Sequence, residues 1–215
     1  MRIGDTEYPR QLLNSPSPPR ALYVIGPPIP SSRIISIAGS RKASRQALAI
    51  ARGVGMALAR EGYTIVTGLA PGVDEHATRG AMRAGGHVVG VLPWLDHYRV
   101  YTVWGYQGAT IVSEFPGQPR GVNPRGLFVA RDRVIAWLGE ALVIIEARPS
   151  SGTIHTFEFA RMAGRRVFVL EPRVVEPEVY RAFRYMVGNG AVPFSDPGEL
   201  VGLLLASPGK AGGGN

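Results

Sequence analysis

The sequence has 215 residues, the size of one ordinary domain and long enough to bury a continuous core. Hydrophobic residues make up 45% and charged residues 19%, a globular balance that excludes a disordered chain. There is no cysteine, which excludes a disulfide framework and a thiolate metal site. Residues 1–10 are polar and unlike a secretory signal, and the longest apolar runs are too short to span a bilayer. We therefore expect a soluble, cytoplasmic protein with no membrane partner.

The chain is strongly basic. Its formal net charge is +8, and all but two of its 24 basic residues are arginine. A basic excess attracts polyanions, and a guanidinium group binds phosphate oxygens through two parallel hydrogen bonds. A GC-rich genome or a hot habitat explains many arginines equally well. Composition leaves both explanations open, so the positions of the arginines have to decide between them.

The predicted elements alternate regularly after an irregular start. Residues 1–32 are rich in proline and serine and form an arm, with a candidate strand at 21–25. Apolar, β-branched runs then predict strands at residues 33–38, 63–67, 87–92, 111–112, 141–146 and 166–170. Helical spacing predicts helices at residues 43–60, 73–84, 130–138, 153–163, 178–187 and 197–205. The glycine-rich tail, residues 207–215, is expected to be disordered.

This alternation predicts an α/β fold, a doubly wound and mainly parallel sheet. The two most continuous apolar strands, 33–38 and 141–146, should lie near its centre. We expect a single domain with a short N-terminal arm: the arm at 1–32, the core at 33–206 and the tail at 207–215.

Three segments that follow predicted strands have the composition of ligand-binding loops. They are Gly39-Ser40-Arg41, residues 67–74 and residues 149–153. In open α/β sheets, ligands bind beyond the carboxyl ends of the strands and against helix N-termini. Each segment taken alone is more often only a turn with a helix cap. Three of them on one edge of the sheet indicate a ligand rich in phosphate.

A fourth feature is a pair of arginines at the expected start of a helix. Arg131 and Arg133 flank Asp132, after a loop that carries Arg120 and Arg125. This arrangement fits a solvated helix start in which the aspartate pairs locally. It also fits a basic rim beside the strand-end loops, where phosphates are neutralised.

The sequence contains no recognisable catalytic constellation. Its four histidines are scattered and lack metal-binding spacing, and neither a G-x-S-x-G elbow nor a Walker A loop occurs. We therefore expect no catalytic residue, no metal site and no cofactor.

Taken together, the motifs resemble the DNA-processing protein A (DprA/Smf) family over about residues 6 to 172. The matching stretches are Tyr8-Pro9, Gly39-Ser40-Arg41 with Ser44, Thr67-Gly68-Leu69-Ala70-x-Gly72-Val73-Asp74, Leu95-Asp96, Ser113-Glu114-Phe115-Pro116, Phe128-x-x-Arg131-Asp132-Arg133, Val143 to Ala147 and Ser151-Gly152-Thr153. The family usually has Arg-Asn-Arg where this chain has aspartate at position 132, which partly offsets the charge of the two arginines. We expect a version of the family's core without the helical N-terminal and winged-helix C-terminal domains that many members carry.

The resemblance implies a Rossmann-like core that binds single-stranded DNA, forms dimers and delivers the strand to a recombinase during DNA uptake. The apolar segments 183–187 and 200–205 offer a dimer face, although covering the last strand explains them equally well. We predict that phosphates of the DNA lie in one pocket. Its candidate residues are Gly39, Ser40, Arg41, Thr67, Gly68, Gly72, Arg131, Arg133, Ser151, Gly152 and Thr153.

Two alternatives remain for the same loops. Nucleotide phosphoribohydrolases have a similar fold and a glycine-rich motif ending in Gly-Thr-x-x-Glu. Here Thr156 occupies the position of that glutamate, and Glu158 lies two residues further on. Hydrolase activity is therefore not expected. The other alternative is a carrier of a nucleotide or cofactor without a role on DNA.

Overall fold

The computed structural model describes residues 1–97, 108–173 and 176–206. Within them the chain forms one sheet of eight strands in the order β1-β5-β4-β3-β2-β6-β7-β8. The strands are β1 (Tyr23–Ile25), β2 (Ile34–Gly39), β3 (Thr64–Thr67), β4 (Val88–Val91), β5 (Thr110–Ser113), β6 (Ala141–Ile145), β7 (Arg166–Leu170) and β8 (Val192–Phe194). All neighbouring pairs are parallel except β1 with β5. The predicted Rossmann-like, mainly parallel sheet is confirmed; the tail expected at 207–215 lies outside the described residues.

Strands β2 and β6 lie near the centre of the sheet, as the sequence predicts. The two strands are parallel neighbours, with Ile37 opposite Val143, and both side chains are fully buried. A strand covered on both faces needs apolar residues at every position, which is why these two runs do not alternate with polar residues.

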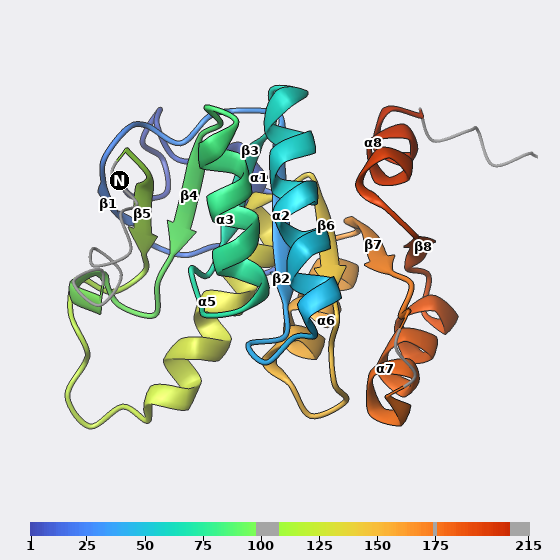
Figure 1. Ribbon diagram of the computed structural model, residues 1–215. Coiled ribbons are helices and arrows are strands. Elements are labelled where there is room, and N and C mark those ends of the chain that lie inside the picture. Colours follow the sequence, from blue (N-terminus) through green and yellow to red (C-terminus); the bar gives the residue numbers. More distant parts are fainter. Residues whose placement is uncertain (98–107, 174–175, 207–215) are drawn as a thin grey trace, which may run out of the picture.

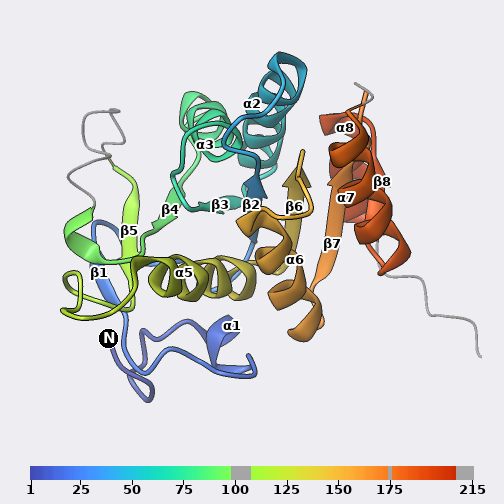
Figure 2. The same ribbon diagram turned by 90° about the horizontal axis from the view of Figure 1, so that it is seen from below.

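Helices cover both faces of the sheet (Figures 1 and 2). They are α1 (Arg10–Leu13), α2 (Arg45–Arg60), α3 (Val73–Arg83), α5 (Pro124–Leu138), α6 (Gly152–Met162), α7 (Pro177–Gly188) and α8 (Pro197–Leu205), with a short 3₁₀ helix η1 (Leu95–His97). One apolar cluster joins α2, α3 and α8 to the sheet, and a second joins α5, α6 and α7 to the opposite face. The loops that follow β2 and β6 therefore emerge between two helical layers.

The N-terminal arm packs on the same core. Tyr8, Leu12 and Leu22 are at most 3% exposed and belong to the cluster beneath α5. Strand β1 then pairs antiparallel with β5 at the edge of the sheet. The arm thus buries apolar surface against the core and packs against α5.

Several elements differ from the sequence-based prediction, which also lacks the short helices α1 and η1. Helix α5 begins at Pro124 and not near residue 130, because the Asn123 side chain caps it by accepting from the Arg125 N–H (3.0 Å) and proline suits the first turn. Arg131 and Arg133 consequently lie in mid-helix. Strand β8 was not predicted; it has only three residues, one of them Pro193.

In the part of the chain that the structure describes, no helix combines the length and the apolar character needed to cross a bilayer.

Candidate nucleic-acid interface

A cleft of about 600 Å³ opens at the carboxyl ends of β2 and β6, between α3, α5 and α6. In Figure 1 this is the lower edge of the sheet, toward which the arrowheads of β4 and β6 point. Its lining residues are Ala38, Gly39, Ser40, Arg41, Lys42, Ala70, Asp74, Arg125, Phe128, Val129, Arg131, Asp132, Ile135, Arg148, Ser151, Gly152, Thr153, His155 and Thr156. The cleft combines several cationic side chains with small and hydroxyl residues from strand ends.

The first wall is the turn after β2. The Ser40 N–H donates to the Glu146 carbonyl at 2.7 Å, and the Val73 N–H donates to the Ser40 carbonyl at 3.2 Å. These bonds tie the turn to the end of β6 on one side and to the start of α3 on the other. The Ser40 hydroxyl accepts from the Lys42 N–H and from Arg148 Nη1, each at 3.1 Å. The turn is therefore held from three sides, with its hydroxyl at the cleft.

The second wall is the N-terminus of α6, formed by Ser151, Gly152 and Thr153. The Ser151 hydroxyl donates to the Arg148 carbonyl at 2.7 Å and makes no capping bond to the helix. These residues line the cleft, so the first-turn amides and the positive end of the helix dipole favour an anion there.

Arg131 and Arg41 approach the cleft over one aromatic ring. Their guanidinium carbons lie 5.7 Å and 5.6 Å from the centre of the Phe128 ring. Arg131 is only 5% exposed, and within the described residues its Nε atom makes no hydrogen bond, although it lies 3.4 Å from the Asp132 carboxylate. A buried guanidinium with unused donor capacity is suited to bind an anion that enters the cleft.

Gly68 makes room for Arg131. A Cβ atom on residue 68 would overlap the guanidinium of Arg131, so only glycine permits this close approach. The next residue, Leu69, has a left-handed backbone (φ 51°), which is strained for a branched side chain. The loop after β3 is thus shaped to accept the arginine from α5.

Asp74 supports the same loop from the start of α3. Its carboxylate accepts from the Gly68 N–H (3.0 Å) and the Ala70 N–H (3.5 Å). Burial raises the pKa of Asp74 to about 6, an effect that the nearby Arg131 and the two backbone N–H groups oppose.

Asp132 places a second carboxyl group in the cleft. Its Oδ1 atom lies 3.4 Å from Arg131 Nε, the local pairing that the sequence suggested. Burial raises the pKa of Asp132, and the charges of Arg131, His155 and Arg41 oppose this rise. The aspartate therefore weakens the positive potential that the arginines create.

The structure brings together seven of the eleven predicted site residues at the cleft. They are Gly39, Ser40, Arg41, Arg131, Ser151, Gly152 and Thr153. Gly68 lies behind Arg131, and Gly72 packs with φ 90° against the backbone of residues 40 and 41. Thr67 is buried, and its hydroxyl lies 3.2 Å from that of Thr78. These three residues shape the loops and do not line the cleft.

Arg133 was expected to lean over the cleft, and it does not. It forms an ion pair with Glu114, donates to the Ser17 hydroxyl at 3.3 Å and covers the Trp137 ring at 5.3 Å. Two residues apart on an α-helix, side chains point about 200° away from each other. Arg131 therefore lines the cleft, whereas Arg133 lies on the other side of α5 and joins this helix to the arm.

Sequence reasoning missed several lining residues, among them Arg148. It lies between β6 and α6, in a loop where no periodic pattern marks its direction. Lys42, Phe128 and His155 also line the cleft. Phe128 could have been found from its position three residues before Arg131, because such pairs share a helix face.

Among the residues that the structure describes, the side chains that a hydrolase or a metal site would need do not lie together in the cleft. Glu158 accepts from the Tyr185 hydroxyl (2.7 Å) and pairs with Arg161 (3.0 Å) on the outer side of α6, and it does not line the cleft. Among the described residues no group of three His, Asp or Glu side chains could hold a metal ion.

Comparison with known proteins decides the family. The model of the family described as DNA recombination-mediator protein A matches residues 1–204. The chain belongs to this family. The resemblance seen in the sequence motifs is thereby confirmed, and with it membership of a family of DNA-processing proteins.

Curated relatives of the DNA recombination-mediator protein A family are longer than this chain. Protein Smf from Synechocystis is 33% identical over 95% of the chain and 53% of the relative, and Protein Smf from Escherichia coli is 32% identical over 92% and 54%. The chain therefore spans about half the length of the curated relatives it matches.

Solved structures share the fold. DNA processing protein A from Streptococcus pneumoniae superposes with a TM-score of 0.80 at 26% identity, covering 94% of this chain and 72% of that one. DNA processing protein A from Helicobacter pylori, described for its single-stranded DNA binding mode, gives 0.75 at 23% identity and covers 92% of both chains. A molybdenum cofactor carrier protein from Chlamydomonas reinhardtii gives 0.59 at 23% identity over 80% and 96%.

Proposed function

We propose that the cleft binds the sugar-phosphate backbone of single-stranded DNA. The observation that carries the proposal is the placement of Arg41 and Arg131 over the same Phe128 ring, in a cleft that the N-terminus of α6 also lines. Two guanidinium groups and a helix N-terminus supply both charge and directed donors for phosphate oxygens.

The proposed contacts read the backbone and not the bases. Arginine forks, serine and threonine hydroxyls and helix amides recognise phosphate irrespective of sequence. We therefore propose binding with little sequence preference and with a strong dependence on salt, because each neutralised phosphate releases counterions.

Membership of the DNA recombination-mediator protein A family supports this choice of ligand. The relative from Helicobacter pylori is described as binding single-stranded DNA, which makes the same ligand the first to test here. We propose further that the chain is not an enzyme, that it acts in the cytoplasm, and that it presents the strand to a recombinase.

We also propose that the chain forms a homodimer through its C-terminal helices. Tyr180 and Tyr185 on α7 are 48% and 46% exposed and leave aromatic surface that a second copy of the chain could cover. Light scattering at micromolar protein tests this assembly. A mass equal to one chain contradicts it.

Competition between ligands tests the proposed function directly. A labelled oligothymidine and a free nucleoside monophosphate are titrated against the protein at physiological salt. The proposal predicts much tighter binding of the oligonucleotide, because several phosphates contact the protein at once. Preference for the free nucleotide would favour the carrier that the same cleft permits.

A further inference from the structure

Arg148 is the cationic residue that links the two walls of the cleft. It lies in the loop between β6 and α6 and is 29% exposed. Its Nη1 atom donates to the Ser40 hydroxyl at 3.1 Å and to the Lys42 carbonyl at 3.4 Å. The guanidinium thus lies beside the turn that we propose to bind phosphate.

The other side of the same guanidinium is held by a carboxylate. Arg148 Nη2 donates to Glu176 Oε2 at 2.6 Å. Glu176 directly precedes α7, and its side chain is 49% exposed. The pair therefore joins α7, at the edge of the sheet, to the mouth of the cleft.

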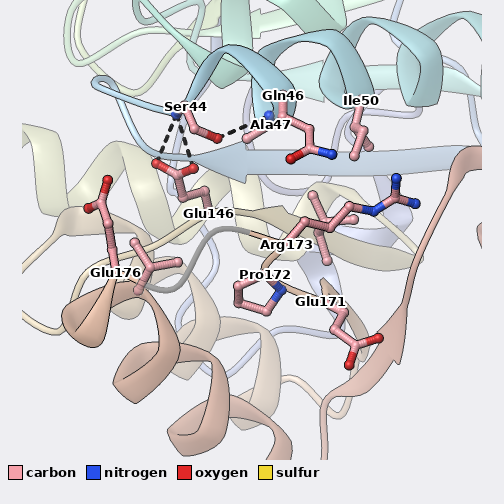
Figure 3. Close-up of a pocket in the computed structure, with 11 residues that line it drawn as sticks. Ser44, Gln46, Ala47, Ile50, Glu146, Glu171, Pro172, Arg173 and Glu176 are labelled. Carbon is pink, nitrogen blue, oxygen red and sulfur yellow. Dashed lines mark hydrogen bonds between the residues drawn. The ribbon is translucent and has the colours of Figure 1, made fainter.

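A second carboxylate nearby is already engaged elsewhere. Figure 3 shows a smaller neighbouring pocket in which the Glu146 carboxylate accepts from the Ser44 N–H at 3.1 and 3.0 Å. Glu146 lies 3.8 Å from Arg148 Nη1, farther than the 2.6 Å of the Glu176 contact. Glu176 is thus the carboxylate that holds Arg148 most closely, and it does so from an exposed position.

We propose that Arg148 is a further phosphate-binding residue and that Glu176 competes with the phosphate for it. The proposal rests on the proposed binding of single-stranded DNA in this cleft. An exposed ion pair contributes little net stability, so an entering phosphate can replace the carboxylate at small cost. The phosphate gains a bidentate contact, whereas the released Glu176 is rehydrated.

The two residues should affect DNA binding in opposite directions. Arg148→Ala removes a phosphate contact and should weaken binding about fivefold or more. Glu176→Gln removes the competitor while keeping the size of the side chain, and should tighten binding by roughly twofold to fivefold. In the Arg148→Ala background, Glu176→Gln should lose most of this effect, because no guanidinium remains to be released.

Glu178→Gln is the matched control for the change in net charge. Glu178 is an exposed acidic residue in the first turn of the same helix, so its removal changes the charge of α7 equally. Binding of a fluorescein-labelled oligothymidine of about 15 nucleotides is measured by anisotropy for the parent, the three single variants and the double variant. Thermal unfolding of each variant verifies that the fold is retained.

Tighter binding by Glu176→Gln than by Glu178→Gln, abolished in the double variant, supports the proposal. Equal binding by these two glutamine variants overturns it and leaves the DNA-binding function standing. Parent-like binding by Arg148→Ala likewise overturns it alone. A parent protein that fails to bind the oligonucleotide overturns the proposed function, and the proposal with it.

Discussion

Arg131 and Gly68 fit together so closely that a methyl group on residue 68 would occupy the space of the guanidinium. The arginine comes from α5 and the glycine from the loop after β3, so their contact fixes the helix against the strand end. The same contact keeps a cation that is only 5% exposed at the cleft, without a hydrogen bond to Nε in the described residues.

Gly68→Ala should therefore displace Arg131 and weaken binding of single-stranded DNA about as much as Arg131→Ala does. Anisotropy titration measures the effect. Gly126→Ala is the matched control, because Gly126 lies in α5 with nothing near its added Cβ, and this change should stabilise the helix by roughly 1 kcal/mol. Parent-like binding by Gly68→Ala would contradict the role given to Arg131.

Arg133 should contribute to the stability of the fold, whereas Arg131 should contribute to DNA binding. Arg133→Ala leaves the Glu114 carboxylate buried without its cation, which should lower the free energy of unfolding by roughly 1–3 kcal/mol. Its effect on DNA binding should stay within about twofold, because Arg133 does not line the cleft. At physiological salt the Debye length is about 8 Å, so charges outside the cleft are screened. The double variant Arg133→Ala, Glu114→Gln should recover part of the lost stability. If Arg133→Ala weakens DNA binding as strongly as Arg131→Ala does, Arg133 belongs to the DNA-binding site after all.

The sequence predicts the strand ends better than it predicts the arginines. Gly39 to Arg41 and Ser151 to Thr153 follow strands whose continuous apolar pattern fixes both position and direction, so their convergence could be inferred. The rotation of α5 about its axis decides which arginine points into the cleft. Packing against the sheet and the arm sets this rotation, and no local sequence pattern shows it. The start of α5 at Pro124 could have been read from Asn123-Pro124, a cap followed by proline. The position of Arg148 in the cleft could not be predicted, because residues in a loop follow no periodic pattern that fixes the direction of a side chain.

Asp132→Asn should strengthen DNA binding. The substitution keeps the shape of the side chain and restores the asparagine usual at this position in the family that the motifs resemble. Two like charges about 4 Å apart repel each other by about 1 kcal/mol even in bulk water. Removing the carboxylate charge from beside Arg131 removes such a repulsion of an entering phosphate and should raise affinity about fivefold. Titrations of parent and variant at one salt concentration measure the change. Unchanged or weaker binding would show that Asp132 does not oppose the arginines.

Asp74 should make stability depend on pH. Its pKa is raised from 3.8 to about 6, so the folded protein binds more protons than the unfolded chain between these values. The Asp74 contribution to stability therefore falls as the pH rises through this window. Relative to the parent, Asp74→Asn should gain about 1–3 kcal/mol between about pH 4 and about pH 7.

Urea unfolding of both proteins at several pH values measures this difference, and the other titrating groups cancel because both proteins share them. In Asp74→Asn the amide oxygen of the new side chain can still accept from the Gly68 N–H, which keeps the loop intact. A pH-independent difference between the two proteins would mean that Asp74 titrates normally.

The salt dependence of single-stranded DNA binding tests the central claim most directly. The affinity of the parent, Arg41→Ala and Arg131→Ala for a labelled oligothymidine is measured over a series of salt concentrations. If both arginines neutralise phosphates in the cleft, each variant binds more weakly and its slope of log K against log salt is smaller in magnitude by about 0.7 per lost contact. Parent-like affinity and slope in both variants would contradict the assignment of the cleft as the DNA-binding site.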